Sequence, residues 1–86
     1  MGKTPMNDAD LRAVVVATLQ TIAPEVEPGL LRDSRPLRLQ VDLDSMDWLN
    51  FLIALNERLN VVIRERDYGQ LVTINDLVAY LKARLG

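Results

Sequence analysis

The chain has 86 residues, of which 49% are hydrophobic and 26% are charged, with a formal net charge of −2. This is enough apolar material for one small core, so we expect a single domain over residues 1–86, with residues 1–6 as a flexible N-terminus. The acidic balance argues against nucleic acid as a partner, and no apolar run approaches the ~20 residues of a membrane span. Cysteine and histidine are absent, which excludes disulfides and serine–histidine catalysis and is typical of a cytoplasmic protein.

The first helix is predicted from about Asn7 to the residue before Pro24. Asn7 and Asp10 have the spacing of a capping box, in which each side chain accepts a hydrogen bond from the other residue's backbone N–H. Positions expected to face the core recur at intervals of three and four, as in a helix with one buried side. They are Leu11, Val14, Val15, Thr18, Leu19 and Ile22.

A long connection follows and ends at Asp44, with Pro28, Gly29 and Pro36 interrupting any regular pattern. Connections of this length are usually functional or disordered. Its apolar residues predict that it is pinned onto the helices; they are Leu30, Leu31, Leu37, Leu39, Val41 and Leu43. A basic cluster of Arg32, Arg35 and Arg38 is interpreted as a solvated stretch, with contact to a partner or a phosphate as the alternative.

The second long helix is predicted from Ser45 to about Leu59. Asp44 is a favoured N-cap residue and Asp47 stands three positions later, so the pair indicates an acidic capping box. Ser45 is then the first helical residue, and its hydroxyl is left free. A phosphate ester there would meet the unpaired N–H groups and the positive dipole end of the helix. We therefore expect a phosphate-linked group to be attached at Ser45.

This helix carries more apolar surface than one core-facing side requires. The stripe expected to be buried consists of Trp48, Phe51, Leu52, Leu55 and Leu59. A second stripe, which we call the Met46 stripe, consists of Met46, Leu49 and Ile53. A helix with two apolar faces either lies at the centre of a core or keeps an exposed patch for a partner. Both interpretations of the Met46 stripe are open from the sequence.

The rest of the chain predicts an extended link, a short helix and a final helix. Residues 60–63 form the link, and residues 65–70 make at most a turn or two of helix, which Gly69 weakens. Thr73 and Asp76 form a further capping box, opening a helix whose buried side carries Ile74, Leu77, Val78 and Leu81. The expected fold class is therefore all-α: a small bundle of three main helices plus one short helix, with a long loop between the first two main helices.

The run Asp44-Ser45-Met46-Asp47, followed by an apolar helix, resembles the modification motif D-S-L-[DE] of acyl carrier proteins. The resemblance covers nearly the whole chain: counted from Ser45 without gaps, Leu71 falls on the family's short third helix and 73–74 on the start of its last helix. It implies that Ser45 carries 4′-phosphopantetheine through a phosphodiester, with Asp44 beside it. It also implies a carrier and not an enzyme.

The resemblance implies partners as well. In the family, the positions one, four and eight after the serine meet partner enzymes, and the Met46 stripe occupies them here. We expect Asp47 and Asn50 to belong to the same face. The implied partners are a phosphopantetheinyl transferase and acyl-activating, ketosynthase or acyltransferase enzymes. The carrier is expected to be a monomer and to hold no metal ion.

The family also implies a space between the second and last main helices that shelters an acyl chain. The residues expected to line it are Trp48, Leu52, Leu55, Ile63, Leu71, Ile74 and Leu77. Trp48 is bulky, so the space is expected to be small or its opening restricted. Plain core packing is the alternative for most of these residues.

Two departures from the family pattern bear on the pathway. Asn50 and Asn56 stand where the family commonly has acids, and Arg58 adds a positive charge; Asp42 replaces the usual glycine before the motif. We therefore expect a specialised lipid, polyketide or related pathway with weaker electrostatic steering. Two alternatives are open: an aminoacyl or peptidyl carrier with the same arm, and an unmodified helical module that binds a partner through the Met46 stripe.

Overall fold

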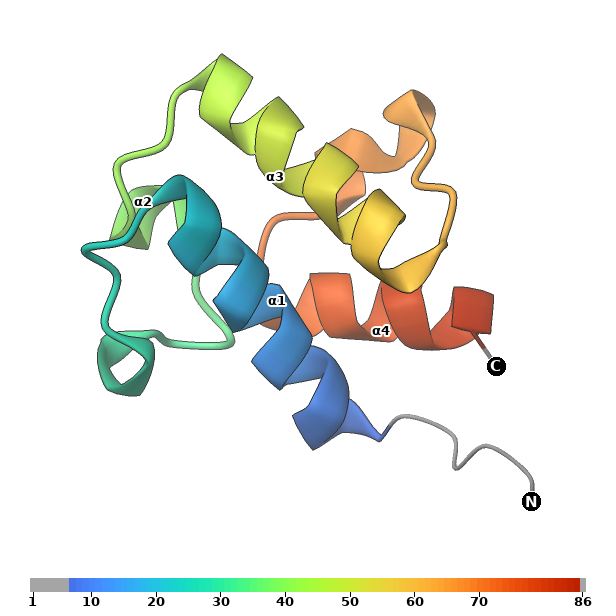
Figure 1. Ribbon diagram of the computed structural model, residues 1–86, viewed down its shortest axis with the longest axis horizontal. Coiled ribbons are helices and arrows are strands. Elements are labelled where there is room, and N and C mark those ends of the chain that lie inside the picture. The colour runs from blue at the N-terminus through green and yellow to red at the C-terminus, as the bar shows by residue number, and fades with distance from the viewer. Residues whose placement is uncertain (1–6, 86) are drawn as a thin grey trace.

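The structure is a computed structural model that describes residues 7–85, so the expected flexible segment 1–6 lies outside the described residues. Three long helices make the bundle: α1 (Asp8–Ile22), α3 (Ser45–Leu59) and α4 (Ile74–Leu85). Between them lie the 3₁₀ turn η1 (Pro28–Leu30), the four-residue helix α2 (Leu37–Gln40) and the 3₁₀ segment η2 (Glu65–Gln70). Helix α1 contacts both α3 and α4 (Figure 1). The predicted all-α class with three main helices is confirmed.

Two of the predicted capping boxes form completely. Asn7 Oδ1 accepts from the Asp10 N–H at 2.8 Å, while the Asn7 N–H donates to Asp10 Oδ2 at 3.4 Å. Thr73 and Asp76 exchange the same pair of bonds, each at 3.0 Å. These bonds satisfy N–H groups that have no partner within the helix. The starts of α1 and α4 are therefore fixed by local side chains.

The core lies where the three long helices meet. Its fully buried apolar side chains come from all three long helices and from α2; they are Leu11, Val15, Leu19, Leu37, Phe51, Leu52, Leu55, Ile74, Leu77 and Leu81. Val14 and Ile22, expected on the buried side of α1, are only partly buried and pack against this core. Val16, which the pattern did not include, is buried. One continuous core thus holds α3 and fixes where its first turn stands.

The connection between α1 and α3 is pinned onto the helices as predicted, but not all of its apolar residues face inward. Its buried leucines and valines are Val26, Leu37, Val41 and Leu43, and Leu31 packs partly against the core. Val26 was not among the residues expected to pin the connection. Leu30 and Leu39 are exposed, so the prediction was wrong for them. Residues two apart on a helix do not share a face, and burial of Leu37 therefore turns Leu39 outward.

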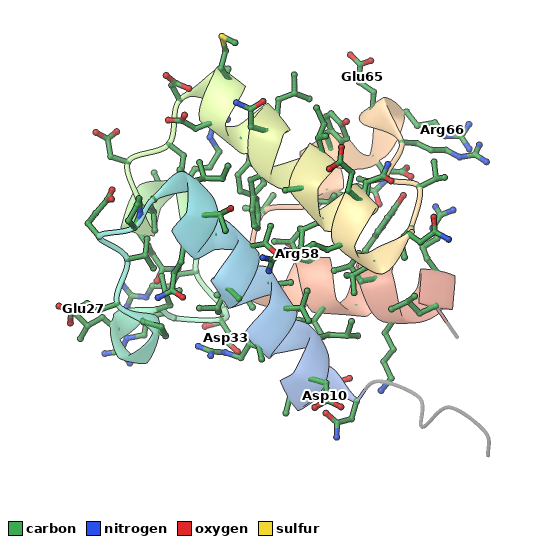
Figure 2. The ribbon with its side chains drawn as sticks, viewed as in Figure 1. Asp10, Glu27, Asp33, Arg58, Glu65 and Arg66 are labelled. Carbon is green, nitrogen blue, oxygen red and sulfur yellow. The ribbon has the colours of Figure 1, made fainter. Side chains whose placement is uncertain are left out.

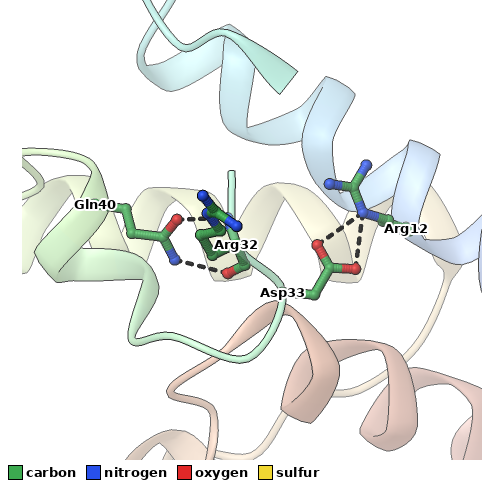
Figure 3. A network of polar contacts seen from close by, with 4 residues as sticks. All are labelled: Arg12, Arg32, Asp33 and Gln40. Atoms are coloured by element: carbon green, nitrogen blue, oxygen red, sulfur yellow. Dashed lines mark hydrogen bonds and ion pairs between the residues drawn. The ribbon is translucent and has the colours of Figure 1, made fainter. Parts of the chain in front are cut away.

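Polar contacts fasten this connection, as Figure 3 shows. The Gln40 side chain accepts from the Arg32 N–H at 2.6 Å and donates to the Arg32 carbonyl at 2.8 Å. Nearby, Arg12 Nε on α1 lies 2.9 Å from both carboxylate oxygens of Asp33. The Leu37 N–H also donates to the Val72 carbonyl at 2.8 Å, which ties α2 to the segment before α4. The long loop is thus held on two sides before it reaches Ser45.

Candidate functional site

The first turn of α3 is set by Asp44. Its backbone is extended, and its Oδ1 accepts from the Asp47 N–H at 2.8 Å. The Asp44 carbonyl accepts from the Trp48 N–H at 3.0 Å, which begins the helical pattern. The predicted N-cap is therefore confirmed. The return bond from the Asp44 N–H to the Asp47 carboxylate does not form among residues 7–85, so only half of the predicted capping box is present.

Ser45 is the first residue of α3, and it is exposed. Its hydroxyl makes no hydrogen bond to any residue in the described part of the chain. Because the N–H groups of Asp47 and Trp48 are used, those of Ser45 and Met46 are the ones left unpaired within residues 7–85. Figure 1 places this turn at the upper edge of the molecule, where a second protein can reach it. The site thus joins a free hydroxyl to the positive end of a helix.

The Met46 stripe lies on the surface. Met46, Leu49 and Ile53 are 71%, 41% and 44% exposed, whereas the opposite side of α3 is buried in the core. Asn50, between them in sequence, is also exposed, and Asp47 is partly buried. The structure therefore excludes core packing as the role of the stripe. Which partners it meets is still a prediction.

The seven residues expected to line an acyl space are all buried and belong to one packed core cluster. A recess of about 200 Å³ opens beside them, which we call the Trp48 recess. Its walls are Pro36, Arg38, Trp48, Tyr68, Gly69, Leu71 and Val72. Only Trp48 and Leu71 were expected there. The sequence placed Arg38 in a basic cluster and gave no signal that Tyr68 would lie near it.

Comparison with known proteins decides the family. A profile described as the phosphopantetheine attachment site matches residues 10–81. The chain therefore belongs to the phosphopantetheine attachment site family. It is 33% identical over 73 residues to an acyl carrier protein of Helicobacter hepaticus, covering 85% of this chain and 90% of the relative. It is also 30% identical over 77 residues to an acyl carrier protein of Chlamydia caviae, covering 90% of this chain and 94% of that relative.

Membership of this family identifies the type of cofactor. The family carries covalently attached 4′-phosphopantetheine, and its members are carriers that work with a phosphopantetheinyl transferase and biosynthetic enzymes. This chain is therefore a carrier rather than an enzyme. An exposed, unbonded hydroxyl beside two unpaired N–H groups fits a phosphodiester, since anions are favoured at helix N-termini.

Two further observations concern metal ligands and membrane-spanning helices in the described part of the chain. Among residues 7–85, no three acidic side chains are placed to hold a metal ion. No helix in the same range is long and apolar enough to cross a bilayer.

The side chains of α3 carry little net charge. The helix carries Asp47 and Glu57 but also Arg58. The Arg58 side chain, labelled in Figure 2, reaches towards α1, where its Nη1 donates to Thr18 Oγ1 at 3.3 Å. The positive charge of Arg58 thus lies on the side of α3 that faces α1. The exposed face of α3 consequently combines the Met46 stripe with little net charge.

Proposed function

We propose that this protein is an acyl carrier that holds acyl intermediates as thioesters on 4′-phosphopantetheine attached to Ser45. The observation that carries the proposal is the exposed, unbonded hydroxyl of Ser45 at the first position of α3. The attached group supplies a flexible arm ending in a thiol, which bears the cargo. The acyl carrier proteins among its relatives support acyl cargo over aminoacyl cargo.

Each residue of the first turn has a role in this proposal. Asp44 fixes the start of α3 through its bond to the Asp47 N–H. The unpaired N–H groups of Ser45 and Met46 favour the negative charge of a phosphodiester at the Ser45 hydroxyl. Attachment at an exposed turn leaves cargo accessible, and tethering makes each later encounter depend on effective concentration.

The Met46 stripe is the surface through which partner enzymes recognise the carrier, together with Asp47 and Asn50. Its exposed apolar side chains supply area that becomes buried in a complex. Because α3 has only two acids and one arginine, charge contributes less to encounter than in a strongly acidic helix. This favours dedicated partners in a specialised lipid, polyketide or related pathway, with the monomeric carrier acting in the cytoplasm.

The experiment is modification in vitro. The protein is incubated with coenzyme A and a phosphopantetheinyl transferase, and its intact mass is measured. The wild type and Ser34→Ala, which changes the chain's other serine, should each gain one arm. Ser45→Ala should gain none. An unmodified wild type would support a partner-binding module instead, and loading by an enzyme that activates amino acids, but not by one that activates fatty acids, would indicate aminoacyl cargo.

A further inference from the structure

The Trp48 recess brings together three separate segments of the chain. Pro36 and Arg38 come from the start of α2, Trp48 from α3, and the other walls from η2 and the residues that follow it. Its volume of about 200 Å³ exceeds that of an engineered apolar cavity of ~150 Å³ that binds benzene. Leu52 and Leu55, which were expected to line an acyl space, are buried in the core and are not among the walls of the recess. The recess therefore suits a small group and not a long chain.

Arg38 stands at this recess with its charge unpaired. Its guanidinium carbon is 6.0 Å from the centroid of the Trp48 ring, within reach of a cation–π contact. Its Nη2 makes one long bond, 3.4 Å, to the Leu43 carbonyl. The ion pairs within residues 7–85 do not include Arg38. Most of its five N–H donors are therefore available to a ligand, and their fork matches a carboxylate.

The recess is also close to the attachment site. Trp48 follows Ser45 by three residues, which is about 4.5 Å of helix rise. The Leu43 carbonyl that Arg38 contacts lies two residues before Ser45. Cargo tethered at Ser45 meets the recess at an effective concentration in the millimolar range. Even a weak site of this kind is therefore occupied by its own cargo.

We propose that the Trp48 recess is a cargo subsite that favours a short acyl group ending in a carboxylate, with Arg38 pairing with that carboxylate. The proposal rests on the proposed attachment at Ser45. The acids around the attachment point, Asp42, Asp44 and Asp47, would by themselves repel such a cargo. Arg38 supplies the positive charge that reverses this preference, while the Trp48 ring and Leu71 cover the apolar part of the cargo.

The test uses the only tryptophan in the chain, Trp48, as the reporter. The carrier is loaded with succinyl, butyryl or octanoyl groups, and intact mass first establishes that each arm is present and loaded. Trp48 emission and its indole N–H resonance are then compared with those of the unloaded carrier. The variants are Arg38→Gln, which removes the charge, Arg38→Lys, which keeps it without the fork, and Arg35→Gln as a matched control outside the recess.

The succinyl group should shift both Trp48 signals more than the butyryl group does. Arg38→Gln should abolish this difference, weakening occupancy of the recess by roughly fivefold. Arg38→Lys should restore part of it, and Arg35→Gln should leave it intact. Equal shifts from succinyl and butyryl, a larger shift from octanoyl, or an equal loss in Arg35→Gln would each overturn the subsite. Failure to load any arm would instead count against attachment at Ser45.

Discussion

Replacing Leu49 and Leu55 separately by alanine tests whether α3 has one face for the core and one for partners. Leu55 is fully buried, so its truncation leaves a cavity and should cost about 2–5 kcal/mol of unfolding free energy. Leu49 is 41% exposed and leaves no closed cavity, so its truncation should cost about 1 kcal/mol or less. For a domain of this size each kcal/mol lowers the melting temperature by roughly 4–8 °C.

The assay pairs stability with partner recognition. Circular dichroism should find the melting temperature of Leu55→Ala lowered by about 10–30 °C and that of Leu49→Ala by less than about 8 °C. Under conditions where both proteins are folded, Leu49→Ala should be modified by a phosphopantetheinyl transferase more slowly than wild type. Val62→Ala is the control, because Val62 is exposed but lies outside α3. An equally large loss of stability in Leu49→Ala would show that Leu49 belongs to the core, and an unchanged modification rate would show that the Met46 stripe is not part of the interface with the transferase.

Further predictions concern the ends and the charge of α3. Asp44→Ala should lower the unfolding free energy by about 1 kcal/mol, and Asp44→Asn should lower it by less, because asparagine is also a good N-cap residue. Equal losses for the two variants in urea titrations would show that the capping bond does not contribute to stability. Asn60 has the left-handed backbone angles φ 54° and ψ 42°. Asn60→Gly should therefore be neutral or slightly stabilising, whereas Asn60→Val should lower the unfolding free energy by more than about 1 kcal/mol. An unchanged unfolding free energy in Asn60→Val would contradict this expectation. The double variant Asn50→Glu with Asn56→Glu should be turned over faster than the wild type, as a loaded carrier, by a ketosynthase of bulk fatty acid synthesis at low salt. This difference should shrink at high salt, because salt screens charge. Equal turnover of the two proteins would show that charge on α3 does not decide partner choice.

The long helices were predictable because their signals are local. The capping pairs at Asn7 and Thr73 and the three-four spacing of apolar residues fix where α1 and α4 begin and which sides they bury. The segment from η1 to α2 was less predictable, because a single turn carries no period. The orientation of α2 depends instead on a bond from Leu37 to Val72, far away in sequence. That contact explains why Leu39 faces outward.

One part of the candidate site could likewise be predicted from the sequence, and another part could not. The free hydroxyl of Ser45 follows from its place after the N-cap Asp44, so the sequence alone predicted that this hydroxyl takes no part in capping. The Trp48 recess did not follow, because Arg38 and Tyr68 join Trp48 only when α2 and η2 pack beside α3. No spacing along the chain encodes that meeting.

The most direct test of attachment at Ser45 is to locate the arm on the modified wild-type protein by tandem mass spectrometry of its peptides. The chain offers two serines, Ser34 in the connection and Ser45 at the start of α3. We predict that the whole added mass lies on Ser45, with Ser34 unmodified. Added mass on Ser34, or on any residue outside the first turn of α3, would contradict it.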